Sequence, residues 1–364
     1  MKIGFIRQRY VAIGGAEQYL KGMAKALSEQ GHEIHVFANK WDGGEGFRFH
    51  HVPVIHLTSF LRALTFALNA RHVVRHADCD LIFSLERTIA QDVYRAGDGC
   101  HREWLSQRAK YVGPMRNLTV QLNPFHRTVL ALERRTFSVQ CTRAVIANSH
   151  RGKREIVQHY GYPPERIHVI HNGVDCDRFR PEQKRPAGEE MRLLFAGTGF
   201  ERKGLPFCIR ALAELPANVS LQVAGKGDRR RYRALARRLG VENRVHFLGS
   251  AQDIAQLYRN EHVLVHPAIY EPFANVCLEA MASGLPVVTS RINGVSEIIE
   301  HRISGAIVEQ PDDISALAGA IRPYLDAKFR AAASAHARAV AEAHPFAKNV
   351  EDTITLLRKL KSSV

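Results

Sequence analysis

Residues 262–290 have the sequence HVLVHPAIYEPFANVCLEAMASGLPVVTS, and this stretch is the most informative one for the fold. Its apolar start at 262–266 predicts a buried strand, and the turn around Pro272 leads to a helix that begins near Asn275. Gly284 ends that helix, and Pro286 opens the next strand. A strand, an acid-bearing turn, a helix and a second strand are typical of a parallel α/β sheet, which binds ligands at the carboxyl ends of its strands.

Glu271 and Glu279 lie eight positions apart in this stretch. On one continuous helix this spacing would place both carboxylates on one face. Because Glu271 lies in the turn, we expect the two acids to flank a helix N-terminus, whose free N–H groups and positive dipole end favour anions. Two hydroxyl acceptors beside an anion site suit a sugar joined to a phosphate. The alternative is that Glu271 caps the helix and Glu279 is a solvated helix residue.

The rest of the chain repeats this alternation in two halves, separated by a polar linker at 182–190. Its 364 residues favour two domains. We expect strands at 2–6, 33–38, 80–84, 143–147, 167–170, 192–196, 220–224, 245–248, 262–266 and 286–290. We expect helices at 16–30, 57–74, 205–215, 229–239, 253–259, 275–283 and 349–360. This order predicts two doubly wound parallel sheets with a cleft between them.

The composition excludes several other classes of protein. No run of about 18 apolar residues is present, so we expect no membrane span. The first residues, Met1–Arg7, start a strand at once and are too polar for a signal peptide. The six cysteines form no Cys-x-x-Cys pair, which favours reduced thiols in the cytosol and argues against a zinc site.

The net charge of +15 is concentrated in the first half. Residues 1–185 carry 28 Lys and Arg against 17 Asp and Glu, whereas residues 186–364 carry 23 against 19. We therefore expect the first half to meet a membrane surface, a phosphorylated acceptor or nucleic acid, the alternative being unused positive charge. Residues 102–135 hold seven basic and two acidic residues with aromatics between them. Without an RNA-binding signature, this segment favours a membrane surface or an anionic acceptor.

Three glycine-containing loops follow predicted strands. Gly14 and Gly15 open the first helix, where backbone can approach a phosphate closely, although a plain loop is the alternative. A dinucleotide fingerprint would need a further glycine in register, so a dehydrogenase is disfavoured. The loop 197–204 (GTGFERKG) places Arg202 and Lys203 at a helix entrance, where two cations oppose the dipole unless an anion is bound. A third loop, 225–228 (GKGD), can face the same cleft.

Acidic residues elsewhere give weaker signals. Asp78 and Asp80, like Asp175 and Asp177, form Asp-x-Asp triplets that can bind a divalent metal. The first triplet precedes a buried strand and the second lies in a turn, so we expect no metal at either. Asp98 lies between two glycines shortly before His101 and Glu103. This is the best cluster of reactive groups in the first half, with an ordinary Gly-Asp-Gly turn as the alternative.

Together these motifs resemble the family-4 retaining glycosyltransferases of the GT-B fold. The matching segments span nearly the whole chain: 14–17 (GGAE), 171–175 (HNGVD), 197–204 and 271–288. Loop 200–204 and the basic segment after Asp98 are similar to those of lipopolysaccharide core glucosyltransferases that act on inner-core heptose. Ala274 departs from the family, which usually has glycine there, and so leaves the donor sugar open.

The resemblance implies two Rossmann-like domains facing a cleft, residues 1–180 and 181–345, with a C-terminal helix (346–364) returning to the first. The first domain would face the acceptor and the membrane, and the second would bind the nucleotide-sugar. The implied reaction is metal-independent hexose transfer with retention, most often from a UDP-sugar such as UDP-glucose to a glycan or glycolipid. It would take place at the cytoplasmic membrane face and need no cofactor.

The resemblance also implies a role for each candidate residue. Glu279 would bind the ribose and Glu271 the sugar hydroxyls, while Phe273, Ala274 and Asn275 would present backbone to the sugar. The remaining candidates are implied to hold the departing diphosphate (Arg202, Lys203 and the Gly14–Gly15 backbone) or to contact sugar or acceptor (Asp98). Two alternatives stay open, a GT-B sugar-nucleotide epimerase and a basic nucleic-acid-binding protein without enzymatic activity.

Overall fold

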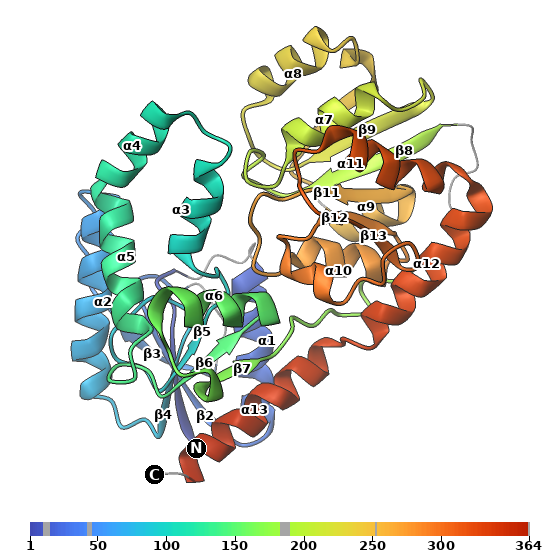
Figure 1. The fold of residues 1–364 in the computed structure, drawn as a ribbon. Coiled ribbons are helices and arrows are strands. Elements are labelled where there is room, and N and C mark those ends of the chain that lie inside the picture. Colours follow the sequence, from blue (N-terminus) through green and yellow to red (C-terminus); the bar gives the residue numbers. More distant parts are fainter. Residues whose placement is uncertain (10–14, 42–45, 183–189, 252, 363–364) are drawn as a thin grey trace. The chain divides into compact units, whose positions relative to one another are not determined.

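The computed structural model describes residues 1–364 except 10–14, 42–45, 183–189, 252 and 363–364. The chain forms two compact units, each built on one parallel sheet (Figure 1). The first comprises Met1–His171 with Asn349–Val364, and the second comprises Asn172–Lys348. The units thus divide the chain after His171, whereas the boundary expected from the sequence is after residue 180. Most of the predicted linker, 183–189, lies outside the described residues.

The first unit contains a seven-stranded sheet in the order β3-β2-β1-β4-β5-β6-β7. Its strands are β1 (Lys2–Ile6), β2 (Glu33–Ala38), β3 (Arg48–His51), β4 (Leu81–Ser84), β5 (Val93–Arg95), β6 (Ala144–Ala147) and β7 (Ile167–Val169). The order reverses between β1 and β4, which pair in parallel. Doubly wound sheets bind ligands outside the carboxyl ends of the strands at such a reversal.

In the part of the chain that the structure describes, this unit also contains the helices α1 (Gly15–Glu29), α2 (Ser59–Arg75), α3 (His101–Ala109), α4 (Pro114–Leu122), α5 (Pro124–Thr136), α6 (His150–Tyr160) and α13 (Phe346–Ser362). The C-terminal helix α13 packs within the first unit, as the family resemblance implied. Its Thr353 hydroxyl lies 3.5 Å from the Tyr19 hydroxyl on α1, and its Leu360 carbonyl accepts a 2.9 Å hydrogen bond from Arg143.

The second unit contains a six-stranded sheet in the order β10-β9-β8-β11-β12-β13. Its strands are β8 (Met191–Ala196), β9 (Val219–Ala224), β10 (Val245–Gly249), β11 (Val263–His266), β12 (Val287–Ser290) and β13 (Gly305–Val308). The reversal here falls between β8 and β11. Strand β11 is buried along its whole length, as its unbroken apolar run predicts for a sheet that is covered on both faces.

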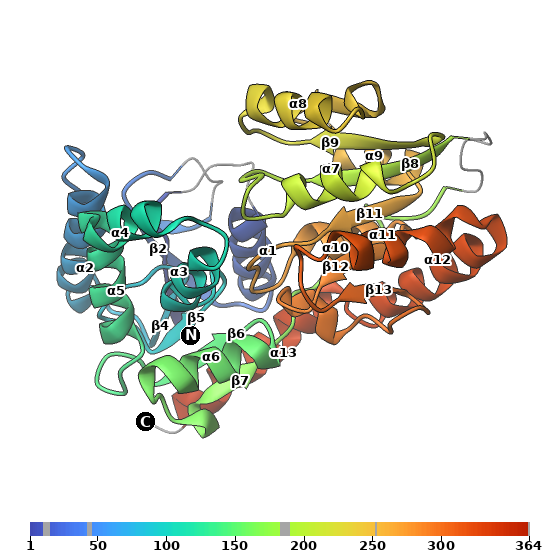
Figure 2. The ribbon, with the colours of Figure 1, turned by 45° about the horizontal axis from the view of Figure 1, so that its top comes forward.

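Two helical layers cover that sheet (Figure 2). The helices of this unit are α7 (Leu205–Ala213), α8 (Arg229–Arg238), α9 (Ile254–Asn260), α10 (Asn275–Ala282), α11 (Ile314–Ile321) and α12 (Ala327–Glu342). Helices α7, α8 and α11 form one buried cluster with Phe195 of β8. Helices α9, α10 and α12 form the other with Leu194 and Leu264. The predicted α/β class with two doubly wound parallel sheets is therefore confirmed.

The sequence-based elements agree best where strands are buried. The strands at 2–6 and 33–38 and the helix start at Asn275 are confirmed at those residues. Strands β3, β5 and β13 and helices α3–α6, α11 and α12 were not predicted. None of the helices in the described part of the chain combines the length and apolar character that a membrane-spanning segment needs.

Glu261, directly before β11, makes the stability of the second unit depend on pH. It is buried, with its carboxylate 3.4 Å from the Arg192 guanidinium. Burial raises the pKa of Glu261 to about 7, and attraction to Arg192 opposes that rise. Because its folded-state pKa lies above its unfolded one, Glu261 stabilises the fold below its unfolded pKa. That contribution is lost as the pH rises through about 7.

We expect Glu261→Gln to raise the free energy of unfolding at pH 8 and to change it little at pH 5. The neutral amide removes the cost of a buried charge, which corresponds to at most about 3 kcal/mol for a shift of this size. Urea unfolding at both pH values measures the difference. Arg192 keeps the Asn260 carbonyl as acceptor at 2.5 Å. An equal effect at both pH values would contradict the burial argument.

Candidate functional site

Two loops meet at the reversal point of the second sheet. One, residues 197–204, follows β8, and the other, residues 267–274, follows β11. The Ile269 amide donates a 2.9 Å hydrogen bond to the Arg202 carbonyl and ties them together. Gly204 allows the close approach, since a Cβ there would lie 1.9 Å from the Pro267 carbonyl oxygen, and its φ is +83°. This position therefore requires glycine.

The third predicted loop, residues 225–228, packs against the loop 197–204. A Cβ on Gly225, which follows β9, would lie 2.0 Å from the Gly197 carbonyl oxygen. The Gly225 amide donates to the Gly249 carbonyl at 2.6 Å, so three strand ends are joined there. Asp228 caps α8 by accepting from the Arg231 amide at 3.2 Å. The glycine-rich loops thus build one surface at the carboxyl edge of the sheet.

Three charged side chains meet between the two loops. The Glu271 Oε2 atom lies 3.4 Å from Arg202 Nη2 and 3.6 Å from Lys203 Nζ. Glu271 and Lys203 are nearly buried, whereas the Arg202 side chain is 37% exposed. Two cations share one carboxylate oxygen at distances longer than a good hydrogen bond. The group keeps an excess positive charge, which suits a further anionic ligand.

Helix α10 begins beside this group without a capping side chain. Its N-cap residue is Ala274, which contributes no side-chain hydrogen bond, so the alternative in which Glu271 caps the helix is wrong. The Ala274 amide donates to Asn293 Oδ1 at 3.2 Å, and Asn172 donates to Asn275 Oδ1 at 2.5 Å. Phe273 is buried in the core. The uncapped first turn presents a positive dipole end to this edge of the sheet.

Glu279 lies one further turn along α10 and is partly buried. Its Oε2 atom accepts a 3.0 Å hydrogen bond from the Tyr258 hydroxyl on α9. Burial raises the Glu279 pKa, and the Tyr258 hydrogen bond and nearby Arg178 and Lys203 oppose the rise. It is therefore not the solvated helix residue of the alternative interpretation. Tyr258 was not predicted as a site residue, although a tyrosine on an apolar helix face signals a hydroxyl that needs a buried partner.

In the first unit, Asp98 lies exposed in the loop between β5 and α3. Arg87 holds this loop by donating from Nη2 to the Gly99 carbonyl at 2.8 Å, and Asn148 donates to the Gly97 carbonyl at 3.3 Å. Helix α1 begins at Gly15, and Gly14 lies outside the described residues.

Glu133 on α5 anchors the Asp98 loop and was not predicted from the sequence. Fully buried, it accepts from Arg87 Nε at 2.9 Å, from the His101 and Arg102 amides at 2.7 and 3.1 Å, and from the Tyr160 hydroxyl. It thereby satisfies the first turn of α3. It is one of only two acids in the basic segment 102–135, and that is the signal that could have identified it.

His101 and Glu103, which the sequence placed in one cluster with Asp98, bond elsewhere. His101 Nε2 lies 3.0 Å from His126 Nδ1, and burial, helped by the Arg87 charge, lowers the His101 pKa to about 4. Glu103 accepts from His159 at 2.7 Å and from Gln107 at 2.5 Å. Of the cluster, Asp98 alone is exposed; His101 and Glu103 are partly buried.

The two Asp-x-Asp triplets take part in local structure. Asp80 accepts from the Lys2 amide at 2.7 Å and pairs with Lys361 at 3.1 Å. Asp175 accepts from the amides of Asp177 and Arg178 at 3.1 and 3.0 Å, closing a turn. In the part of the chain that the structure describes, no three His, Cys, Asp or Glu side chains gather as a metal site would require.

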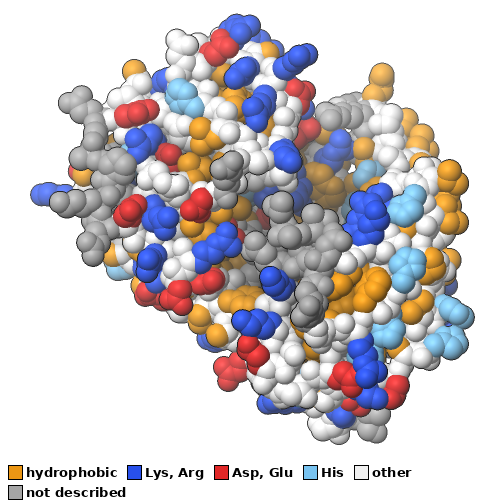
Figure 3. All heavy atoms as spheres, turned by 180° about the vertical axis from the view of Figure 1, so that it is seen from behind, with side chains coloured by type: hydrophobic (Ala, Val, Ile, Leu, Met, Phe, Trp, Pro, Cys, Tyr) orange, Lys and Arg blue, Asp and Glu red, His pale blue; other side chains and the backbone are white. Residues whose placement is uncertain are grey.

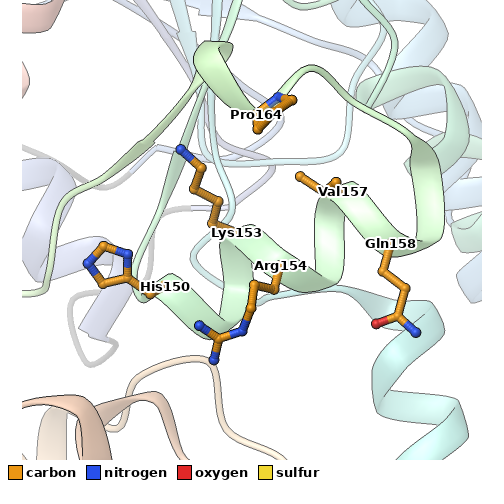
Figure 4. A pocket seen from close by; sticks show the side chains of 6 residues that line it. All are labelled: His150, Lys153, Arg154, Val157, Gln158 and Pro164. Atoms are coloured by element: carbon orange, nitrogen blue, oxygen red, sulfur yellow. The ribbon is translucent and has the colours of Figure 1, made fainter.

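A separate hollow of about 510 Å³ opens on α6 in the first unit (Figure 4). It is lined by His150, Lys153, Arg154, Val157, Gln158 and Pro164. Lys153 already donates to the Ile167 carbonyl at 2.9 Å. None of the residues predicted from the sequence lines this hollow.

Two family models together match most of the chain. The model described as "Glycosyltransferase Family 4" matches residues 13–178, and the one described as "Glycosyl transferases group 1" matches residues 177–340. The lipopolysaccharide glucosyltransferase WaaG of Escherichia coli K12 is 28% identical over 328 residues, covering 85% of this chain and 86% of WaaG.

The fold is also similar to those of solved glycosyltransferase structures. A crystal structure of WaaG, a glycosyltransferase involved in lipopolysaccharide biosynthesis, matches with a TM-score of 0.83 at 27% identity, covering 96% of this chain and 98% of that one. Anabaena HepE in complex with UDP and glucose matches at 0.74 with 23% identity, covering 98% and 99%. The latter similarity shows a shared fold, and the fold common to these proteins is GT-B.

We expect Gly204→Ala to destabilise the protein by about 2 kcal/mol more than Gly199→Ala. Both glycines have positive φ, +83° and +76°, so both variants bear the same kind of backbone strain. Only the Gly204 variant must also push away the Pro267 carbonyl, because a Cβ on Gly199 meets nothing within 4 Å. Urea unfolding of the two variants measures the difference, and equal losses would contradict the close packing of the two loops.

Proposed function

Because the chain belongs to the family 4 and group 1 glycosyltransferases, we propose that it transfers a hexose from UDP-glucose or a related UDP-hexose to a glycan or glycolipid. The transfer retains the anomeric configuration and serves lipopolysaccharide core or other cell-surface polysaccharide synthesis. Similarity to the lipopolysaccharide glucosyltransferase WaaG over most of both chains supports this acceptor class. The observation that carries the proposal is the Glu271 carboxylate between Arg202 and Lys203, beside the uncapped start of α10.

The donor would lie along this edge of the second sheet. Arg202 and Lys203 would hold the diphosphate, helped by the Gly14–Gly15 backbone. Glu271 would accept sugar hydroxyls beside the backbone of Phe273, Ala274 and Asn275, and Glu279 would accept the ribose hydroxyls. The Tyr258 hydrogen bond at 3.0 Å supports this role, because it fixes the direction in which the Glu279 carboxylate points.

Charge development explains why two cations are needed. As the bond between the anomeric carbon and the diphosphate oxygen breaks, negative charge grows on the diphosphate. The oxygen of the acceptor hydroxyl bonds to the same carbon, and its proton passes to the departing diphosphate. Preorganised cations stabilise that charge most in the transition state. In the free protein Glu271 partly offsets the Arg202 and Lys203 charges, and the donor would take over these cations and leave the carboxylate to the sugar. With both cations in place, the reaction needs no metal ion.

The first unit would bind the acceptor, with the exposed Asp98 contacting the acceptor or the transferred sugar. Arg87, Asn148 and the buried Glu133 hold the Asp98 loop, which supports a site that is preorganised before substrate arrives. We propose further that this unit docks peripherally on the inner face of the cytoplasmic membrane.

The membrane proposal rests on exposed apolar side chains of helix α4, which lies within the basic segment 102–135. On α4 the side chains of Met115, Leu118 and Leu122 are 81%, 56% and 64% exposed. More broadly, the face of the molecule in Figure 3 carries hydrophobic side chains at the right edge of the view, with basic side chains and histidines beside them. Exposed Lys110, Arg127 and Arg134 belong to the same segment. Apolar side chains with flanking cations suit insertion among anionic lipid headgroups.

We expect Lys203→Ala and Arg202→Ala each to lower kcat by about 10²–10³-fold, the usual effect of removing one transition-state donor. The assay measures hexose transfer from UDP-glucose to a truncated lipopolysaccharide core, with and without EDTA, which we expect to leave the rate unchanged. Arg237→Ala serves as control, because Arg237 pairs with Glu242 on the solvated face of α8. A Lys203→Ala enzyme with full activity, or strict dependence on Mg²⁺, would refute the assigned chemistry.

We expect the triple variant Met115→Ser, Leu118→Ser, Leu122→Ser to bind anionic vesicles at least about tenfold more weakly than wild type. Leu248→Ser is the matched control, since Leu248 is a 47% exposed leucine of the second unit. Sedimentation with vesicles of 30% phosphatidylglycerol at about 0.05 and 0.3 M salt should also show weaker wild-type binding at the higher salt. Binding that ignores lipid charge, or equal losses in both variants, would rule out docking by α4.

A further inference from the structure

Asn293 is a fully buried side chain in the loop that follows β12. Its Oδ1 atom accepts from the Ala274 amide at 3.2 Å and from the Val295 amide at 3.3 Å. Its Nδ2 atom donates to Thr289 Oγ1 at 3.0 Å. This one side chain therefore joins the turn before α10 to the strand β12.

A second contact ties the backbone of the same turn to the same loop. The Gly294 amide donates to the Glu271 carbonyl at 2.9 Å, and Glu271 and Asn293 form an isolated parallel bridge. Thr289 is in turn anchored, because its hydroxyl donates to the His266 carbonyl at 2.8 Å. The turn 271–274 is thus held at both ends by a chain of bonds that runs through β12 to β11.

We propose that Asn293 is a positioning residue that sets the turn 271–274 against the hexose of the donor, and so governs recognition of the sugar separately from recognition of the nucleotide. This inference rests on the proposed function. Since a buried hydrogen bond lost from one side leaves its partner unsatisfied, removing the Asn293 amide would leave the Ala274 N–H without an acceptor and the turn free to move.

The separation between sugar and nucleotide follows from what Asn293 contacts. Within the described part of the chain, its side chain forms no hydrogen bond with Arg202, Lys203 or Glu279. Those residues are held by other partners: the Arg202 carbonyl by the Ile269 amide, and the Glu279 carboxylate by Tyr258. Loss of Asn293 should therefore disturb the turn that carries Glu271 first. The Glu271 carboxylate also lies 3.4 Å from Arg202 and 3.6 Å from Lys203, but these distances exceed that of a good hydrogen bond. We therefore expect the groups assigned to diphosphate and ribose to be affected less than the sugar side of the site.

The Asn293 contact also determines what the backbone of Ala274 can do, at a position where the family usually has glycine. The Ala274 amide is already engaged by Asn293, so it does not donate to a ligand while that bond persists. Recognition of sugar hydroxyls at this turn then falls on the Glu271 carboxylate, whose distance from the anomeric centre depends on the Asn293 contacts.

Calorimetric titration with UDP and with UDP-glucose, in the absence of acceptor, tests the proposal. In Asn293→Ala we expect the ratio of the UDP-glucose Kd to the UDP Kd to rise about tenfold over wild type, while the UDP Kd itself changes less than about twofold. Thr289→Val removes only the hydroxyl that anchors Asn293 and should raise the ratio in the same direction by a smaller factor. If Asn293→Ala fails to fold, the ratio measured for Thr289→Val tests the proposal in its place.

Ser304→Ala is the matched control for loss of a buried hydrogen bond in the same unit. In the described part of the chain, the buried Ser304 hydroxyl has one hydrogen bond, which it accepts from the Glu300 amide at 3.0 Å. Its ratio should equal that of wild type. An unchanged ratio in Asn293→Ala, or equal weakening of UDP and UDP-glucose, overturns the positioning role and leaves the proposed function standing. A wild-type protein that binds neither compound overturns both.

Discussion

The Glu271 carboxylate, shared between Arg202 and Lys203, is the interaction around which the second unit is arranged. Two consecutive cations directly before α7 oppose the positive end of that helix. The arrangement is tolerated because an acid from another loop lies between the cations, and because the ligand that we propose carries the opposite charge. A local conflict of this kind marks a functional site more reliably than a well-satisfied surface does.

Close backbone packing makes this interaction possible. Gly204 lets the loop after β8 approach the loop after β11, and the Ile269–Arg202 backbone bond fixes their register. Both loops leave the sheet where its strand order reverses, so no helix lies between them. The first unit has a corresponding reversal between β1 and β4. Its Asp98 loop follows the neighbouring strand β5, and a buried acid, Glu133, fixes that loop.

Much of the fold could be predicted from local pattern, and the failures have identifiable causes. Strands β1 and β2 were found because burial on both faces gives continuous apolar runs. Strand β5, Val93–Arg95, is too short to show any period. Helix α3 carries almost no apolar stripe, and its amino end is satisfied by the distant Glu133 instead of by a local capping residue. Helices α5 and α12 had usable signals in Asn123 before Pro124 and in Asp326, both of which cap a helix.

Local sequence alone specifies the alternation of strands and helices, the glycines that permit close loops, and the chemical identity of the acids and cations at the candidate site. These features depend on neighbours in the chain, which is why local pattern reveals them. Only the tertiary structure decided that Glu271 pairs with Arg202 and Lys203, that Tyr258 orients Glu279, and that Asn293 holds the Ala274 amide. These bonds join residues far apart in the chain, and the order of strands in the sheet, which no local period encodes, brings them together.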